Sequence, residues 1–404
     1  MKRRSILKSL GLISLPISWT GNIFAAPVKE NEGPAKGRNL FKELGIRTFI
    51  NAAGTYTMMT GSLMDTDVVE AIRSTSGEFC MLDELQDKVG AKIATLVHSE
   101  SAVVTAGCFS AMTLGLAGVL TGMDQKKVER LPHLEGSGMR SEVIMQKGHV
   151  VGYSKALTNT GCRIIMIETI EELEKAINPN TAMLWFLNVQ SDKGTINHEA
   201  WVAMGKKYNI PTMIDIAADV PPVTNLWKFN DMGFDLVCVS GGKAMHGPQS
   251  AGILMGKKDL IAAARLSMPP RGSTIGRGMK VNKEEIVGMY VAVEKFISLD
   301  HNKQWKVFED RIAVIEGGVK AIPGITTLIS IPPLGNVTPT LTITWDQTKI
   351  PMATKDVMEK LRNGSPSIEV MGSDETGINI TAWVMKNGEE KIVSKRLNEI
   401  FTKA

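Results

Sequence analysis

Apolar runs of strand length alternate with segments of helical period through the middle of this chain. Helical apolar spacing occurs at 111–120, 170–177 and 198–208. The strand-like runs lie at 102–105, 141–146, 164–167, 182–189, 212–216 and 236–240. Since parallel strands are joined through helices, this alternation predicts an α/β fold with a mostly parallel sheet and helices on both faces. The run 252–256 predicts one more strand, antiparallel if its hairpin is tight.

The pattern changes from about residue 303, where helices and strands become shorter and less regular. We expect helices at 305–321, 354–362 and 389–402 and strands at 340–345, 367–371 and 377–381. This predicts a large domain at 46–300, ending in a long helix at 283–299, and a small C-terminal α+β domain at 301–404. In the first part of the chain we expect a short strand and turn at 48–55, helices at 67–73 and 82–97, and a surface loop at 124–140.

The first 26 residues have the features of a secretory signal peptide. Basic residues at the start are followed by an apolar run at 10–24 and by Ala25-Ala26. The pair Arg3-Arg4 favours a twin-arginine signal, which would export the protein to the periplasm already folded. A general secretion signal or a membrane anchor is the alternative. A polar leader is expected at 27–45.

Charge and hydropathy argue against two classes of partner. The predicted signal carries four basic residues and no acid, so its removal takes the formal net charge from +4 to 0. A near-neutral mature chain gives no electrostatic reason to expect nucleic-acid binding. No later segment has eighteen consecutive apolar residues, so no membrane span is expected in the mature form. The four cysteines show no metal-ligand spacing, and no metal site is expected.

One lysine follows directly after the strand-like run at 236–240. The segment Ser240-Gly241-Gly242-Lys243 passes from a strand end through two glycines to the lysine. A lysine held there away from bulk water favours its neutral amine, which can form a Schiff base with an aldehyde. Pyridoxal 5'-phosphate (PLP) is the common aldehyde cofactor that needs such a lysine. The alternative is a glycine-rich turn with an ordinary exposed lysine.

An aspartate stands at the end of another strand-like run, upstream of the lysine. Asp215 lies in Thr212-Met213-Ile214-Asp215-Ile216. A carboxylate at the carboxyl end of a buried strand can pair with the pyridine nitrogen of PLP and keep it protonated, so that the ring accepts electrons. The alternative is an aspartate that caps the next helix.

A candidate phosphate site precedes both residues. Gly107-Cys108-Phe109 joins a strand to a helix, and free N–H groups at a helix start bind anions. Ser240 could donate its hydroxyl to the same phosphate. His149 follows the next strand, and its ring could stack on the cofactor; the alternative is a solvated loop histidine.

Several blocks in this order resemble the selenocysteine synthase-related PLP-dependent enzymes of fold type I, in particular the branch of D-glucosaminate-6-phosphate ammonia-lyase. The resemblance runs from about residue 40 to the end of the chain. It is carried by Asn51–Thr55, Glu84–Gln86, Val104–Cys108, Asp215–Ala218, Ser240–Lys243, Gly247–Gln249, Gly276–Val281, Lys283–Gly288 and Gly364–Ile368.

The resemblance implies an aspartate-aminotransferase-like fold, PLP as cofactor, Lys243 as its Schiff-base lysine and Asp215 as the pyridinium partner. It also implies a homodimer or larger homo-oligomer, with sites formed between subunits. Arg271, Arg277 and Lys280 then become candidates for contacts to anionic substrate groups or to a neighbour's PLP phosphate; a solvated basic turn is the alternative. Arg362 is a candidate for a substrate carboxylate.

The function expected from these observations is a PLP-dependent lyase of amino acids or amino sugar acids, most simply an ammonia-lyase. Racemase, aldolase and aminotransferase chemistry start from the same bound state and remain alternatives. A selenocysteine synthase-like transferase and a non-catalytic binding protein with this fold are the others. Selenocysteine synthases carry an additional N-terminal region for tRNA, whereas a signal peptide and leader occupy that place here.

Overall fold

The computed structural model describes residues 38–403 of the chain. The predicted signal peptide lies outside these residues. The short helix α1 (Leu40–Glu43) belongs to a unit that ends at Thr48, and the chain from Phe49 onward forms a second, compact unit.

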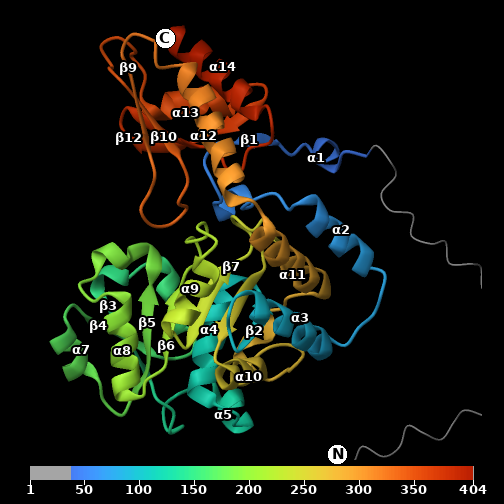
Figure 1. Cartoon of the computed structure of the whole chain (residues 1–404), viewed down its shortest axis with the longest axis vertical. Coiled ribbons are helices and arrows are strands. Elements are labelled where there is room, and N and C mark those ends of the chain that lie inside the picture. The colour runs from blue at the N-terminus through green and yellow to red at the C-terminus, as the bar shows by residue number, and fades with distance from the viewer. Residues whose placement is uncertain (1–37, 404) are drawn as a thin grey trace, which may run out of the picture. The chain divides into compact units, whose positions relative to one another are not determined.

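A seven-stranded sheet forms the centre of the large part of the molecule (Figure 1). Its strands, in spatial order, are β2 (Ser101–Thr105), β8 (Gly252–Gly256), β7 (Leu236–Ser240), β6 (Thr212–Asp215), β5 (Thr181–Leu187), β3 (Glu142–Gln146) and β4 (Arg163–Ile167). The five strands β7, β6, β5, β3 and β4 are parallel to one another. Strand β8 is antiparallel to both of its neighbours, β2 and β7. The predicted α/β fold and the antiparallel strand at 252–256 are thus confirmed.

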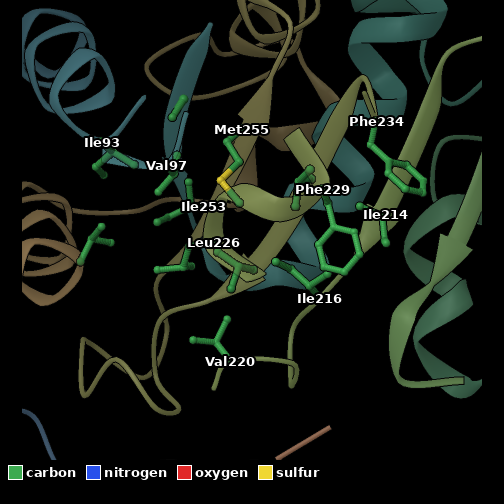
Figure 2. Packing of buried hydrophobic residues seen from close by; sticks show 14 of the residues in the cluster. Ile93, Val97, Ile214, Ile216, Val220, Leu226, Phe229, Phe234, Ile253 and Met255 are labelled. Atoms are coloured by element: carbon green, nitrogen blue, oxygen red, sulfur yellow. The ribbon is translucent and has the colours of Figure 1, made fainter. Parts of the chain in front are cut away.

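Successive residues of each strand point to opposite faces, and both faces are covered. In β3, Ile144 belongs to one hydrophobic cluster, whereas Val143 and Met145 belong to another. Helices that contribute to the first cluster include α3 (Leu82–Leu96), α8 (His198–Tyr208), α9 (Asn225–Met232) and α11 (Lys283–Ser298). Those of the second include α4 (Gly107–Thr121), α6 (Lys155–Thr158) and α10 (Lys258–Leu266). Figure 2 shows part of the first cluster, with Ile214, Phe229 and Ile253 among its labelled residues. Burial on both faces explains why the strands read as continuous apolar runs.

Other elements of this part are short or lie at its edge. They are α2 (Thr66–Thr75), α5 (Gln125–Arg130), α7 (Ile170–Ala176) and five 3-10 turns at Thr57–Met59, Lys147–His149, Gly152–Ser154, Asn188–Lys193 and Ile275–Gly278. Helix α5 lies within residues 124–140, where a surface loop was predicted, so that prediction was wrong for residues 125–130. Its apolar pattern is faint because only Val128 is buried, and the Asp124 side chain caps it by accepting from the Lys126 and Lys127 N–H groups. Helices α9 and α10 were not predicted from the sequence.

The C-terminal part contains a four-stranded antiparallel sheet with helices. The sheet order is β12 (Met371–Asp374), β13 (Gly377–Thr381), β10 (Thr340–Trp345) and β9 (Ile325–Ser330), and the helices are α12 (His301–Gly317), α13 (Thr354–Arg362) and α14 (Glu389–Thr402). Strand β10 alternates buried and half-buried residues, as its period-two pattern predicted. Helix α12 begins and ends four residues earlier than predicted, and β9 was missed.

The first strand of the compact unit pairs with the C-terminal part rather than with the central sheet. Strand β1 (Phe49–Asn51) is parallel to β11 (Ser367–Glu369), and Ile50 and Ala52 share a hydrophobic core with that part. This pairing was not predicted, and residues 46–52 were expected in the large domain. The division at residue 300 stays a prediction.

Among the helices of residues 38–403, none has both the length and the apolar character needed to cross a membrane.

The contact between α3 and β2 leaves no room for a side chain at Gly90. A Cβ atom there would lie 2.1 Å from the Ala102 carbonyl oxygen. We expect Gly90→Ala to lower the free energy of unfolding by about 1–3 kcal/mol, because the helix must move off the strand. The matched control is Gly317→Ala in α12, where a Cβ meets nothing within 4 Å and the free energy should rise by up to about 1 kcal/mol. Urea unfolding measures both, and equal shifts for the two variants would contradict the packing argument.

Candidate functional site

A cavity of about 540 Å³ opens where β6 and β7 end and α4 begins. Its lining includes Asp215 from the last position of β6, Ser240 from the last position of β7, and Lys243. It also includes Gly107, Cys108 and Phe109 from the first turn of α4. The carboxyl ends of parallel strands meet at one edge of a sheet, and this brings together residues that are far apart in sequence.

The two glycines before Lys243 are required by close packing. A Cβ at Gly241 would lie 2.1 Å from the Met289 sulfur, and one at Gly242 would lie 2.4 Å from the Cα of Gln249. The loop is closed by hydrogen bonds from the Gly241 N–H to the Ala251 carbonyl and from the Gly247 N–H to the Gly241 carbonyl. The lysine is therefore presented by a tightly packed loop, not by a mobile glycine turn.

The segment 55–65 covers this loop and adds to the cavity wall. The Ser62 N–H donates to the Gly242 carbonyl at 3.0 Å, and the Asp65 N–H donates to the His246 carbonyl at 3.1 Å. Thr55, Tyr56 and Thr57 line the cavity. The sequence did not indicate this role, because the contacts join positions about 180 residues apart.

The start of α4 offers backbone donors to the cavity. Gly107 has φ +85°, a left-handed conformation that favours glycine, and no side chain caps the helix at Ala106. The first N–H groups of a helix have no partner within it, and they carry the positive end of the helix dipole. In a helix of fifteen residues this end can bind an anion such as a phosphate.

Asp215 is a buried carboxylate that lacks an ionic partner. Its Oδ1 accepts hydrogen bonds from the Ala217 N–H at 2.8 Å and from the Cys108 thiol at 3.4 Å. Burial raises the pKa of Asp215, and these two hydrogen bonds and the charge of Lys243 only partly oppose this rise. Within residues 38–403 it forms no salt bridge, so a cation placed beside it would be strongly stabilised.

Cys108 is held as a thiol beside this carboxylate. A hydrogen bond with Cys238, burial and the charge of Asp215 raise the pKa of Cys108 well above its usual range. The thiol therefore keeps its proton and acts as a donor.

A second buried carboxylate, which the sequence did not single out, lies four residues after Asp215. The Gly335 N–H donates to Oδ1 of Asp219 at 3.2 Å. Burial raises the pKa of Asp219 to about 6; a hydrogen bond from Asn188 opposes the rise, and the charge of Asp215 adds to it. Asp219 thus links the turn after β6 to the loop before β10.

The structure places His149 in the core rather than among the residues that line the cavity. It is fully buried, its ring meets Phe186 edge-on at 4.5 Å between centroids, and its Nδ1 accepts from the Leu187 N–H at 3.2 Å. Its predicted stacking on the cofactor stays a prediction. The 3-10 turn at Lys147–His149 directs the ring into the core.

The four candidate substrate residues also lie outside the lining of the cavity. Arg271 pairs with Asp83, with a nitrogen-to-oxygen distance of 2.8 Å. Arg362 forms a two-point pair with Glu369, both N···O distances being 3.0 Å, so its guanidinium is already bound to a carboxylate of the same chain. Arg277 and Lys280 are exposed.

Comparisons with known proteins agree with this picture. Residues 163–275 match the aminotransferase class-V family model. A D-glucosaminate-6-phosphate ammonia lyase of Salmonella typhimurium is 27% identical over 375 residues, which cover 90% of this chain and 98% of the relative. A solved structure of D-glucosaminate-6-phosphate ammonia-lyase has a TM-score of 0.80 at 26% identity, covering 91% of this chain and 99% of the other. An L-seryl-tRNA(Sec) selenium transferase of Mannheimia succiniciproducens is 30% identical over 147 residues, 30% of this chain and 31% of that one.

The predicted resemblance to selenocysteine synthase-related PLP-dependent enzymes of fold type I is thus confirmed, and PLP is the cofactor. The residues of the cavity fit it. A buried carboxylate without a cation suits a protonated pyridine nitrogen, and the start of α4 with the Ser240 hydroxyl suits a phosphate. The assignment of individual site residues stays a prediction.

His149 allows a test through the pH dependence of stability. Burial and the charge of His198 lower the pKa of His149 to about 4. A hydrogen bond with the Gln190 backbone opposes this shift only in part. The folded protein therefore holds the neutral ring, and the stability that this contributes is present above about pH 6.5 and is lost as the pH falls toward 4. We expect the fall in the free energy of unfolding between pH 7 and pH 4 to be smaller in His149→Asn, by up to about 3 kcal/mol.

Urea unfolding at several pH values measures this difference. Asparagine keeps an acceptor for the Leu187 N–H but does not titrate. The control is His98→Asn, because His98 is exposed at a left-handed backbone position that asparagine tolerates. An unchanged pH profile in His149→Asn would contradict the argument.

Proposed function

We propose that this protein is an exported PLP-dependent ammonia lyase that acts on an amino acid or amino sugar acid with a hydroxyl group on its β-carbon. The observation that carries the proposal is the convergence of Lys243, Asp215 and the start of α4 on one cavity. The similarity to D-glucosaminate-6-phosphate ammonia lyase over most of both chains supports elimination as the reaction.

Three parts of the chain would hold the cofactor. Lys243 would bind it covalently through Nζ, Asp215 would pair with the pyridine nitrogen, and the first N–H groups of α4 with Ser240 would bind the phosphate. When bound, PLP supplies a sink for the electron pair left on the substrate α-carbon. Burial of Asp215 strengthens its pairing, because few waters compete there.

The proton transfers fall to Lys243. The neutral Nζ of Lys243 would take the α-proton of the bound substrate and could return a proton to the departing β-hydroxyl, which would leave as water. Hydrolysis at the α-carbon then consumes one water and releases ammonia and a 2-keto acid. One water leaves and one enters, so the net reaction converts the amino acid into its 3-deoxy-2-keto acid and ammonia.

Other reactions of the same fold have less support. Racemisation, aldol cleavage and transamination would need the same lysine and aspartate, but a relative aligned over 90% of this chain is a lyase. Selenium transfer on tRNA is disfavoured by the near-neutral charge expected for the mature chain. Retention of both Lys243 and Asp215 argues against a non-catalytic binding protein.

We also propose a homodimer or a larger homo-oligomer. Its support is the exposure of large apolar side chains on the described chain, with Met58 at 84%, Met81 at 74% and Phe79 fully exposed. Arg277 and Lys280, which are exposed, would then be free to reach the site of a neighbouring subunit. Light scattering of the purified protein gives the mass.

Lys243→Ala tests the cofactor and the reaction together. The wild-type protein should absorb visible light, and it should release ammonia and a 2-keto acid in equal amounts from at least one hydroxylated amino acid or amino sugar acid. The variant should lose the visible band and the activity, because no other amine lines the cavity among residues 38–403. Lys126→Ala, on an exposed residue of α5 that does not line the cavity, is the control for the band. A band that persists in Lys243→Ala would refute the assignment.

Export is tested separately through the paired arginines. We expect Arg3→Lys with Arg4→Lys to retain the protein in the cytoplasm, because the twin-arginine route reads these two side chains. Lys2→Arg, which preserves the pair and the charge, is the control. Cell fractionation and N-terminal sequencing give the outcome, and periplasmic protein from the double variant would contradict this route.

A further inference from the structure

Three residues around the cavity have a backbone conformation that is rare outside glycine. Among residues 38–403, the residues other than glycine with a positive φ are Thr60, His98, Asn209, His246 and Asn336. His98 and Asn209 follow α3 and α8, and a left-handed residue is common after a helix. Asn336 lines the cavity, Thr60 lies in the segment 55–65, and His246 follows Lys243 by three residues. Such a conformation costs free energy, so its presence beside a cavity indicates a function.

His246 makes three hydrogen bonds that join two segments of the chain. Its N–H donates to the Lys243 carbonyl at 3.0 Å, and its own carbonyl accepts from the Asp65 N–H at 3.1 Å. Nδ1 of its ring lies 2.8 Å from the Leu63 carbonyl oxygen. A carbonyl oxygen can only accept, so Nδ1 carries the proton and donates. One half-buried residue thus ties the lysine loop, which we define as residues 241–247, to the segment 55–65.

The two segments are in close contact where these bonds join them. A Cβ atom at Gly61 would lie 2.6 Å from the Gly242 carbonyl oxygen, and the Ser62 N–H donates to that oxygen at 3.0 Å. Thr55–Thr57, at the other end of the segment, line the cavity together with Lys243. The position of this wall relative to the lysine therefore depends on how firmly residues 61–65 are held.

The ring of His246 supplies a contact that glycine could not. Glycine adopts a positive φ without cost, so it would suit the backbone of position 246 better than histidine does. The histidine keeps a less favourable backbone and gains the bond to Leu63. Asparagine also tolerates a positive φ, and its Nδ2 is attached to Cγ as Nδ1 is in histidine, so it could donate in the same place. Aspartate has the shape of asparagine but no donor when it is ionised.

We propose that His246 is a positioning residue, whose ring holds the segment 55–65 on the lysine loop and so keeps the wall formed by Thr55–Thr57 closed beside Lys243. This rests on the part of the proposed function that assigns Lys243 to PLP, and not on the reaction or its substrate. The wall would restrict the approach of water and small reagents to the bond between Lys243 and the cofactor.

Two measurements on the holoenzyme, both without substrate, test this inference. Hydrogen–deuterium exchange with mass spectrometry shows how firmly residues 58–64 are held. The rate at which hydroxylamine abolishes the visible band shows how accessible the bond to the cofactor is. In His246→Gly and His246→Asp we expect both rates to rise roughly 3- to 10-fold, because one hydrogen bond is lost. His246→Asn should stay within about twofold of wild type, because its donor replaces Nδ1.

His98→Gly is the matched control. His98 is also a histidine with a positive φ, and its Nδ1 lies 3.2 Å from an oxygen of Asp231, but it does not line the cavity. Removal of its side chain should change neither rate. Exchange in β5 and β6 should be unchanged in every variant, which would show that the fold is kept.

Unchanged rates in both His246→Gly and His246→Asp would overturn the inference, and so would a His246→Asn protein that reacts as fast as His246→Gly. Faster exchange without faster loss of the band would also overturn it, because the segment would then not shield the lysine. If the wild-type holoenzyme has no visible band, the assignment of Lys243 fails and the inference fails with it. A wild-type protein that has the band but releases no ammonia would refute the lyase proposal alone.

Discussion

The burial of both faces of the parallel sheet is the constraint on which the site depends. Charged groups cannot lie within β5, β6 or β7 without losing hydration, so they are confined to the strand ends. Asp215 occupies the last position of β6, and Lys243 follows β7 by three residues. The sheet therefore sets where the chemistry can occur, and the tight packing around Gly241 and Gly242 sets how the lysine is presented.

The parts of the site that follow from local sequence could be predicted from it. The strand ends before Asp215 and Lys243, and the turn before α4, are each marked by apolar runs and glycines within a few residues. The parts that were missed depend on contacts between distant segments. Strand β1 pairs with β11 because its side chains complete the C-terminal core, and Arg362 is bound by Glu369. The full burial of His149 was not expected, because the direction of its ring depends on neighbours such as Phe186 that strand patterns do not specify.

The charges of the cavity suit the cofactor of the proposed reaction. Lys243 and Asp215 are its charged lining residues among those described, and both are assigned to the cofactor. Asp219 adds a second buried carboxylate near the turn, with its pKa raised by burial and by the charge of Asp215. The negative charge around Asp215 favours a cationic ring over an additional anion.

The pairing of β1 with β11 also has a consequence for the order of events during synthesis. Phe49 and Ser367 are partners although they stand 318 positions apart. A few residues after β1, Thr55–Thr57 line the cavity, and the Ser62 N–H donates a hydrogen bond to the Gly242 carbonyl next to Lys243. During translation, residues 55–65 leave the ribosome early. Strand β11, which pairs with the neighbouring β1, is made only near the end of the chain. The strands of the central sheet are all made before β11, so this sheet can form before β1 finds its partner.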